Sequence, residues 1–184
     1  ECKLEFPNNW GLGSSSTLLN NLATLYEINP YELHFSTTNG SGYDIACAGS
    51  NSALIYQVLE NIPDVKKIHW SPIFKDEILF IFLKKKQKSN LEVKRFKELK
   101  KDPNLINRIS SITKEIIHSK TIEEFECLLD EHEAITGQYI QNETVKSKYF
   151  SDYQGSIKSL GAWGGDFVLA TRKNKNYFFE KGLD

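Results

Sequence analysis

A glycine- and serine-rich turn that leads directly into a helix is the feature that most constrains the fold near the start of this chain. The turn spans residues 7–16, with Gly11 and Gly13 inside it, and the leucines that follow recur at helical spacing up to Leu25. Glycines let backbone amides approach an anion without a Cβ in the way, and the first turn of a helix presents unpaired N–H groups at its positive end. The pattern therefore predicts a cradle for a phosphate group.

The same turn has a simpler interpretation, an ordinary helix N-cap in which Ser15 or Ser16 accepts hydrogen bonds from the first helical amides. It is not a Walker A loop, because no Lys-Ser/Thr pair follows the last glycine, and it lacks the third glycine of a dinucleotide fingerprint. A phosphate bound here would be held mainly by backbone amides and hydroxyls. The turn by itself leaves both interpretations open.

Two later segments carry related chemistry. Residues 40–49 place Asp44 between small residues after a Ser-Gly pair, and a second glycine-rich turn at residues 161–166 precedes an apolar run. In this order the three motifs resemble those of the GHMP kinases, which include galactokinase, homoserine kinase, mevalonate kinase and phosphomevalonate kinase. The Gly-Tyr-Asp-Ile-Ala string at residues 42–46 is similar to the string for which one subfamily is named. The resemblance extends over residues 7–170.

The resemblance implies an ATP-dependent kinase that uses Mg²⁺ and transfers the γ-phosphate to a hydroxyl or acid group of a small metabolite, as mevalonate kinase does. ATP would be bound by the residues that match the two glycine motifs: Gly11, Leu12, Gly13, Ser14, Ser15, Ser16, Gly161, Gly164 and Gly165. Ser15 would also reach the magnesium ion, and Asp44 would act as the base or orienting group for the substrate hydroxyl. In an arbitrary protein the same aspartate fits a helix cap or a turn.

The chain departs from the family pattern at the metal. Members that use an aspartate base often carry a magnesium-binding glutamate eleven residues before that aspartate. Counted back from Asp44, this position is Leu33, and Glu32 lies one residue off the spacing. Trp163 and Asp166 replace small residues in the late motif, so they either set substrate choice or pack and cap. The missing glutamate keeps a second hypothesis open, a non-catalytic nucleotide-binding or regulatory protein of the same fold.

The expected fold is α+β, of the two-domain GHMP-kinase type. Residues 1–62 would be the remainder of an N-terminal ATP-binding domain, and residues 63–184 a C-terminal domain in which helices cover a ferredoxin-like antiparallel sheet. Family members carry a substantial region before the Gly-Leu-Gly loop, which arrives here at residue 11. We therefore expect much of the N-terminal domain to be missing and this segment alone to be inactive.

The expected elements alternate short strands with longer helices. Strands are predicted at residues 3–6, 53–58, 66–70, 77–83, 156–158, 168–172 and 176–179, and helices at 17–26, 31–35, 91–100, 104–118 and 122–141. The last helix begins with a capping box, Thr121 and Glu124, and its apolar stripe includes His132. No second histidine follows at i+4, so His132 is expected in a core or interface and not on zinc.

Composition argues against several classes of partner. The 23 basic and 24 acidic residues give a net charge of −1, which offers no electrostatic case for nucleic acid or an anionic membrane. The one basic cluster, residues 84–88, fits a solvated strand end, although it could also reach a phosphate. The three cysteines are widely spaced, which favours reduced thiols. Since the sequence also shows neither a membrane span nor a signal peptide, we expect a cytoplasmic protein. The family includes monomers and dimers, so a homodimer stays open.

Overall fold

The computed structural model describes residues 3–7, 10–60, 62–85, 89–161, 163 and 165–183, without the side chains of residues 89–91. The chain divides into two compact units, Glu1–Trp70 and Ser71–Asp184. The boundary that we expected between residues 62 and 63 falls inside the β-hairpin of the first unit, whereas the two units divide after that hairpin.

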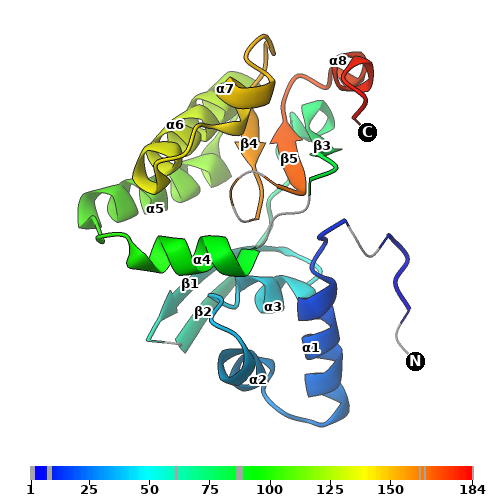
Figure 1. Ribbon diagram of the computed structural model, residues 1–184, viewed down its shortest axis with the longest axis vertical. Helices are drawn as coiled ribbons and strands as arrows, with labels where there is room; N and C mark the ends of the chain where they lie inside the picture. Colours follow the sequence, from blue (N-terminus) through cyan, green and yellow to red (C-terminus); the bar gives the residue numbers. More distant parts are fainter. Residues whose placement is uncertain are drawn as a thin grey trace. The chain divides into compact units, whose positions relative to one another are not determined.

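In its described residues the first unit has three helices and one hairpin, which Figure 1 shows in blue to cyan. Its elements are α1 (Ser14–Leu25), α2 (Pro30–Thr37), α3 (Tyr43–Ala48), β1 (Ala53–Leu59) and β2 (Ile62–Ile68). The two strands are antiparallel, with Leu59 opposite Ile62. Helix α1 contacts α2 and α3, and α3 contacts β1. The first glycine-rich turn and the Ser-Gly-x-Asp segment therefore belong to one packed unit.

In its described residues the second unit combines helices with a three-stranded sheet, and both appear in green to red in Figure 1. Its elements are the 3-10 turn η1 (Lys75–Glu77), β3 (Leu79–Phe82), α4 (Ser89–Glu98), α5 (Pro103–His118), α6 (Ile122–Ile140), α7 (Val145–Tyr149), β4 (Ile157–Ser159), β5 (Phe167–Ala170) and α8 (Lys175–Glu180). Strand β5 lies between β3 and β4 and is antiparallel to both. Helix α6 contacts α5 and β4.

The core of the second unit forms on alternate residues of its sheet. Ile81, Ile157 and Val168 are almost fully buried, as strand alternation requires for one covered face. They cluster with aromatic side chains near α7 and α8, among them Phe150 and Phe178. Burying each large apolar side chain contributes about 1.5–3 kcal/mol, so this cluster is the main stabilising element of the unit.

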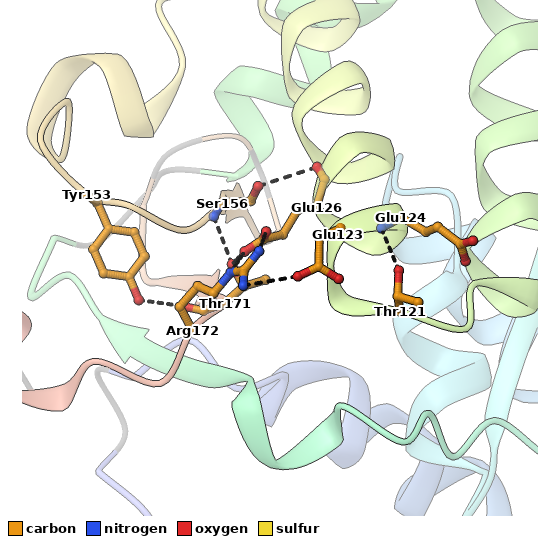
Figure 2. Close-up of polar contacts among 8 residues, drawn as sticks. All are labelled: Thr121, Glu123, Glu124, Glu126, Tyr153, Ser156, Thr171 and Arg172. Atoms are coloured by element: carbon orange, nitrogen blue, oxygen red, sulfur yellow. Dashed lines mark hydrogen bonds and ion pairs between the residues drawn. The ribbon is translucent and has the colours of Figure 1, made fainter.

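A polar cluster joins the beginning of α6 to the end of β5 (Figure 2). Thr121 Oγ1 accepts a hydrogen bond of 3.2 Å from the Glu124 amide, which caps α6 as the sequence predicts. One turn later the Glu126 carboxylate accepts hydrogen bonds from the Thr171 hydroxyl and the Arg172 guanidinium. The helix is thus fixed to the sheet by charge-assisted contacts.

Most of the expected elements are confirmed, and two are wrong. The predicted helices at 31–35, 91–100, 104–118 and 122–141 correspond to α2, α4, α5 and α6. Residues 3–6 form no strand, since β1 pairs with β2 and no other described strand is in that sheet. The segment expected as a strand at 176–179 is helix α8, because the Asn174 side chain accepts a hydrogen bond of 3.2 Å from the Tyr177 amide and starts a helix that buries Phe178.

The fold is therefore α+β, with helices and small antiparallel sheets in both units. None of the helices in the described part of the chain combines the length and the apolar character that crossing a membrane requires.

Candidate functional site

The glycine-rich turn ends in a helix N-terminus that no side chain of the described residues caps. Gly11 and Gly13 have φ angles of 69° and 70°, a left-handed conformation that glycine adopts without a Cβ penalty, and Gly13 is the N-cap of α1. The Ser16 hydroxyl donates to the Gly13 carbonyl at 2.8 Å and does not accept from a first-turn amide. The simple N-cap interpretation of the serines is therefore wrong. No described side chain accepts from the N–H groups of the first turn, which are therefore open to a ligand or to water.

The side chains of this turn differ in how they can meet a ligand. Ser15 and Leu12 are exposed, Ser14 is half-buried and Ser16 is buried. Since its hydroxyl is already used within the turn, Ser16 can contribute to anion binding mainly through its amide. Ser15 is the hydroxyl best placed to reach a group in solvent.

Asp44 lies in the first turn of α3 and not at its N-cap, which is Gly42. The carboxylate is half-buried, and its Oδ1 accepts a hydrogen bond of 3.1 Å from the Ile45 amide. Burial raises the pKa of the Tyr43 hydroxyl and of the Cys47 thiol, and the negative charge of Asp44 raises both further. Asp44 thus shares its surroundings with groups that can donate hydrogen bonds to a bound molecule or to the carboxylate itself.

The turn that precedes Asp44 is held tightly. Gly42 has a φ of 82°, and a Cβ placed on it would come within 3.1 Å of the Tyr56 hydroxyl and 3.3 Å of the Phe35 ring. The Tyr56 hydroxyl, on β1, donates to the Ser41 carbonyl at 2.6 Å. Only glycine fits this position, since it needs both the left-handed conformation and the missing Cβ. The position of Asp44 on α3 is therefore fixed from outside the helix.

The structure packs the helices of two predicted motifs against each other. Helix α3, which carries Asp44, packs on α1, and a Cβ at Gly49 would lie 3.4 Å from Asn20 Oδ1 in the middle of α1. The two helices that start at the predicted phosphate turn and at the predicted base are therefore neighbours. Gly161 and Gly165 belong to the second unit, where Gly161 is exposed with a φ of 65° and Gly165 is buried. Gly164 lies outside the described residues.

The expected metal site has few protein ligands. Glu32 is exposed in the first turn of α2, next to the half-buried Leu33. No group of three or more His, Cys, Asp or Glu side chains among the described residues could hold a metal ion. Mg²⁺ bound with nucleotides commonly takes only one or two side chains and completes its shell with phosphate oxygens and water. An exposed hydroxyl such as Ser15 fits that requirement.

Sequence reasoning missed a buried ionic cluster on α6. The Glu133 carboxylate, 6% exposed, accepts hydrogen bonds of 3.1 Å from the Ser159 amide and from the Lys158 ammonium group. Lys158 Nζ also lies 3.2 Å from His132 Nδ1. Burial, assisted by the Lys158 charge, lowers the pKa of His132 to about 4. The cluster fixes the residues just before the second glycine-rich turn, and its only signal in the sequence is a glutamate beside an apolar stripe.

This cluster predicts a pH dependence of stability. His132 binds a proton near pH 6.5 in the unfolded chain but only near pH 4 in the folded protein, so the folded state loses stability as the pH falls through that window. At pH 5 we expect a loss of about 1–2 kcal/mol relative to pH 7. In urea unfolding, His132→Gln should not show this decrease in the free energy of unfolding between pH 7 and pH 5. His69→Gln changes an exposed histidine and should show the same decrease as the parent. Equal pH dependence in all three proteins would contradict the assignment.

No protein-family model, curated protein or solved structure matches this chain.

Proposed function

We propose that this chain carries catalytic elements of a GHMP-type, ATP-dependent kinase that phosphorylates a hydroxyl or acid group of a small metabolite, mevalonate being the model acceptor. The observation that carries the proposal is the pair of left-handed glycines, Gly11 and Gly13, that lead into the uncapped N-terminus of α1. Backbone amides in this arrangement bind phosphate groups without a lysine in the loop. The order of the three motifs along the chain supports the same function.

The described residues suit the roles that phosphoryl transfer needs. ATP, when bound, supplies the phosphoryl group, and catalysis is mostly positioning and charge neutralisation. The amides and hydroxyls of residues 11–16 would hold its phosphates, with Ser15 toward Mg²⁺. Asp44 would orient the acceptor hydroxyl or accept its proton, since only its Oδ1 has a hydrogen-bond partner among the described residues. Gly161, Gly164 and Gly165 would contribute the late glycine motif that the resemblance assigns to nucleotide binding.

The topology of the second unit also supports the family proposal. The second unit has the order of the first five elements of a β-α-β-β-α-β ferredoxin-like fold, namely β3, the helices up to α6, β4, β5 and α8. The central position of β5 between β3 and β4 agrees with the split β-α-β arrangement of that fold. The assignment of the N-terminal unit to ATP binding and of the C-terminal unit to a GHMP-type domain belongs to this proposal, with the boundary after the β1–β2 hairpin and not at residues 62 and 63.

A second candidate is a nucleotide-binding protein without turnover. It is favoured by Leu33, which stands where an aspartate-using member of the family often has a metal-binding glutamate. Such a protein would keep the phosphate turn of residues 11–16 and lose efficient transfer.

The test is ADP release by the full-length protein with ATP, Mg²⁺ and a panel of hydroxy acids, sugars and amino acids. Release that depends on one acceptor supports the kinase. Saturable binding of MgATP, measured by calorimetry, without release on any acceptor supports the second candidate. Absence of both binding and release would overturn the two together.

A further inference from the structure

Two lysines that are far apart in the sequence meet at one tyrosine ring in the second unit. Lys85 Nζ lies 3.8 Å from the centroid of the Tyr149 ring, and Lys148 Nζ lies 5.3 Å from it. Lys85 follows β3, whereas Lys148 and Tyr149 belong to α7. Both lysines are exposed and Tyr149 is half-buried, so the ammonium groups and the edge of the ring can be reached from solvent.

No carboxylate among the described residues neutralises this pair. Neither Lys85 nor Lys148 forms an ion pair with a described residue. The two ammonium groups lower the pKa of the Tyr149 hydroxyl, Lys85 more strongly than Lys148. Two like charges beside one ring repel each other, and the cation–π contacts offset only part of that cost. An anion would relieve the repulsion.

A second lysine–tyrosine contact in the same unit shows how this chain completes such an arrangement internally. Lys181 Nζ lies 4.9 Å from the Tyr177 ring centroid and 3.6 Å from Asp152 Oδ1. The Tyr177 hydroxyl donates to the same carboxylate at 2.5 Å. Here a carboxylate of the protein accepts from both the phenol and the ammonium group. At Tyr149 the corresponding acceptor is not supplied by any described residue.

The Tyr149 cluster adjoins the second glycine-rich turn. The Asp166 amide donates to the Lys85 carbonyl at 2.7 Å, and the Leu83 amide donates to the Asp166 carbonyl at 2.7 Å. These bonds extend the β3–β5 pairing beyond the strands and fix the backbone of Lys85 beside the end of the turn at residues 161–166. The basic segment at residues 84–88, read from the sequence as a solvated strand end, thus has one member held in a defined place.

We propose that Lys85, Lys148 and Tyr149 form a binding site for the oxyanion group of a small metabolite, either a phosphate or a carboxylate. Two ammonium groups and one phenol can all donate hydrogen bonds to a single oxyanion. The oxyanion would then have the role at Tyr149 that the Asp152 carboxylate has at Tyr177. The site lies wholly in the second unit and does not require that the turn at residues 11–16 binds ATP. It can therefore be tested whether or not the kinase proposal holds.

The experiment is a titration of the isotope-labelled full chain with sodium phosphate and, separately, with sodium malonate, at ionic strength held constant with NaCl. Amide signals of Lys85, Lys148 and Tyr149 should shift along a saturable curve, with a dissociation constant on the order of 1 mM for a site of two charges. The stronger of the two titrations identifies phosphate or carboxylate as the preferred group. Lys85→Ala and Lys148→Ala should each weaken binding at least fivefold, and the double variant should abolish saturation.

The matched control is Lys181→Ala, which removes the lysine whose ring contact already has a carboxylate and should leave binding unchanged. Lys148→Arg should retain binding, because it keeps the positive charge. All these positions are exposed, so the variants should unfold at temperatures close to that of the parent, and the titrations compare folded proteins. Shifts that rise linearly with both anions, or that are the same in the double variant as in the parent, would overturn the proposal.

Discussion

Replacing Asp44 by alanine should lower kcat for phosphorylation of the acceptor by about 10²- to 10⁴-fold, the usual contribution of a positioned acid or base. The affinity for MgATP and the stability should change little, because the carboxylate is half-buried and its one hydrogen bond among the described residues is to the neighbouring Ile45 amide. The measurement is steady-state ADP release with the best acceptor, together with thermal unfolding of both proteins. A loss confined to kcat separates a role in the reaction from a role in the fold.

Two further variants sharpen this result. Asp44→Asn keeps the shape of the side chain and should be impaired almost as strongly, since an amide cannot take up a proton. Asp64→Ala removes an exposed carboxylate on β2 of the same unit and should retain full activity. Normal turnover by Asp44→Ala would remove this residue from the mechanism.

Replacing Gly155 by alanine should destabilise the second unit by about 3 kcal/mol or more, the largest effect that we expect of a single methyl group in this chain. The added Cβ would lie 2.6 Å from Thr171 Oγ1 and 2.9 Å from the Thr171 carbonyl oxygen. Thr171 is fully buried and cannot move aside, because its hydroxyl accepts from the Ser156 amide at 2.8 Å and donates to Glu126 (Figure 2). Overpacking and a lost buried hydrogen bond each cost about 1–3 kcal/mol.

Equilibrium unfolding in urea measures this effect, and Gly49→Ala provides the control. Gly49 has a φ of −92°, and its nearest neighbour would be 3.4 Å from the new Cβ, an ordinary contact. We expect that variant to stay within about 0.5 kcal/mol of the parent. If Gly155→Ala were equally harmless, the close packing of the loop against β5 would be wrong.

The elements that could be predicted from the sequence are those with a local signal. Helix α6 has a capping box at Thr121 and an apolar stripe, and α2 has the Asn29-Pro30 pair, whose asparagine side chain accepts from the Tyr31 amide at 2.9 Å. Both begin where the sequence indicates. The glycines of the turn before α1 were also readable, because glycine favours left-handed backbone, but α1 begins at Ser14, three residues before the predicted helix.

Other features depend on contacts that no local pattern encodes. The aromatic run at residues 177–179 favours a strand by propensity, but Phe178 is buried against Phe150 and Tyr153, and the Asn174 cap selects a helix. Lys85 and Lys148 are separated by more than sixty positions, so only the folded chain shows that they share the Tyr149 ring. The pairing of Glu133 with Lys158 is hidden for the same reason.

The most direct measurement of the kinase proposal is a crystal structure of the full-length protein with magnesium and a non-hydrolysable ATP analogue. The proposal predicts phosphate oxygens within hydrogen-bond distance of the amides of residues 13–16, with the Asp44 carboxylate facing the terminal phosphate across the space for an acceptor. A triphosphate bound elsewhere, or an Asp44 carboxylate turned toward a surface remote from it, would contradict the proposed function.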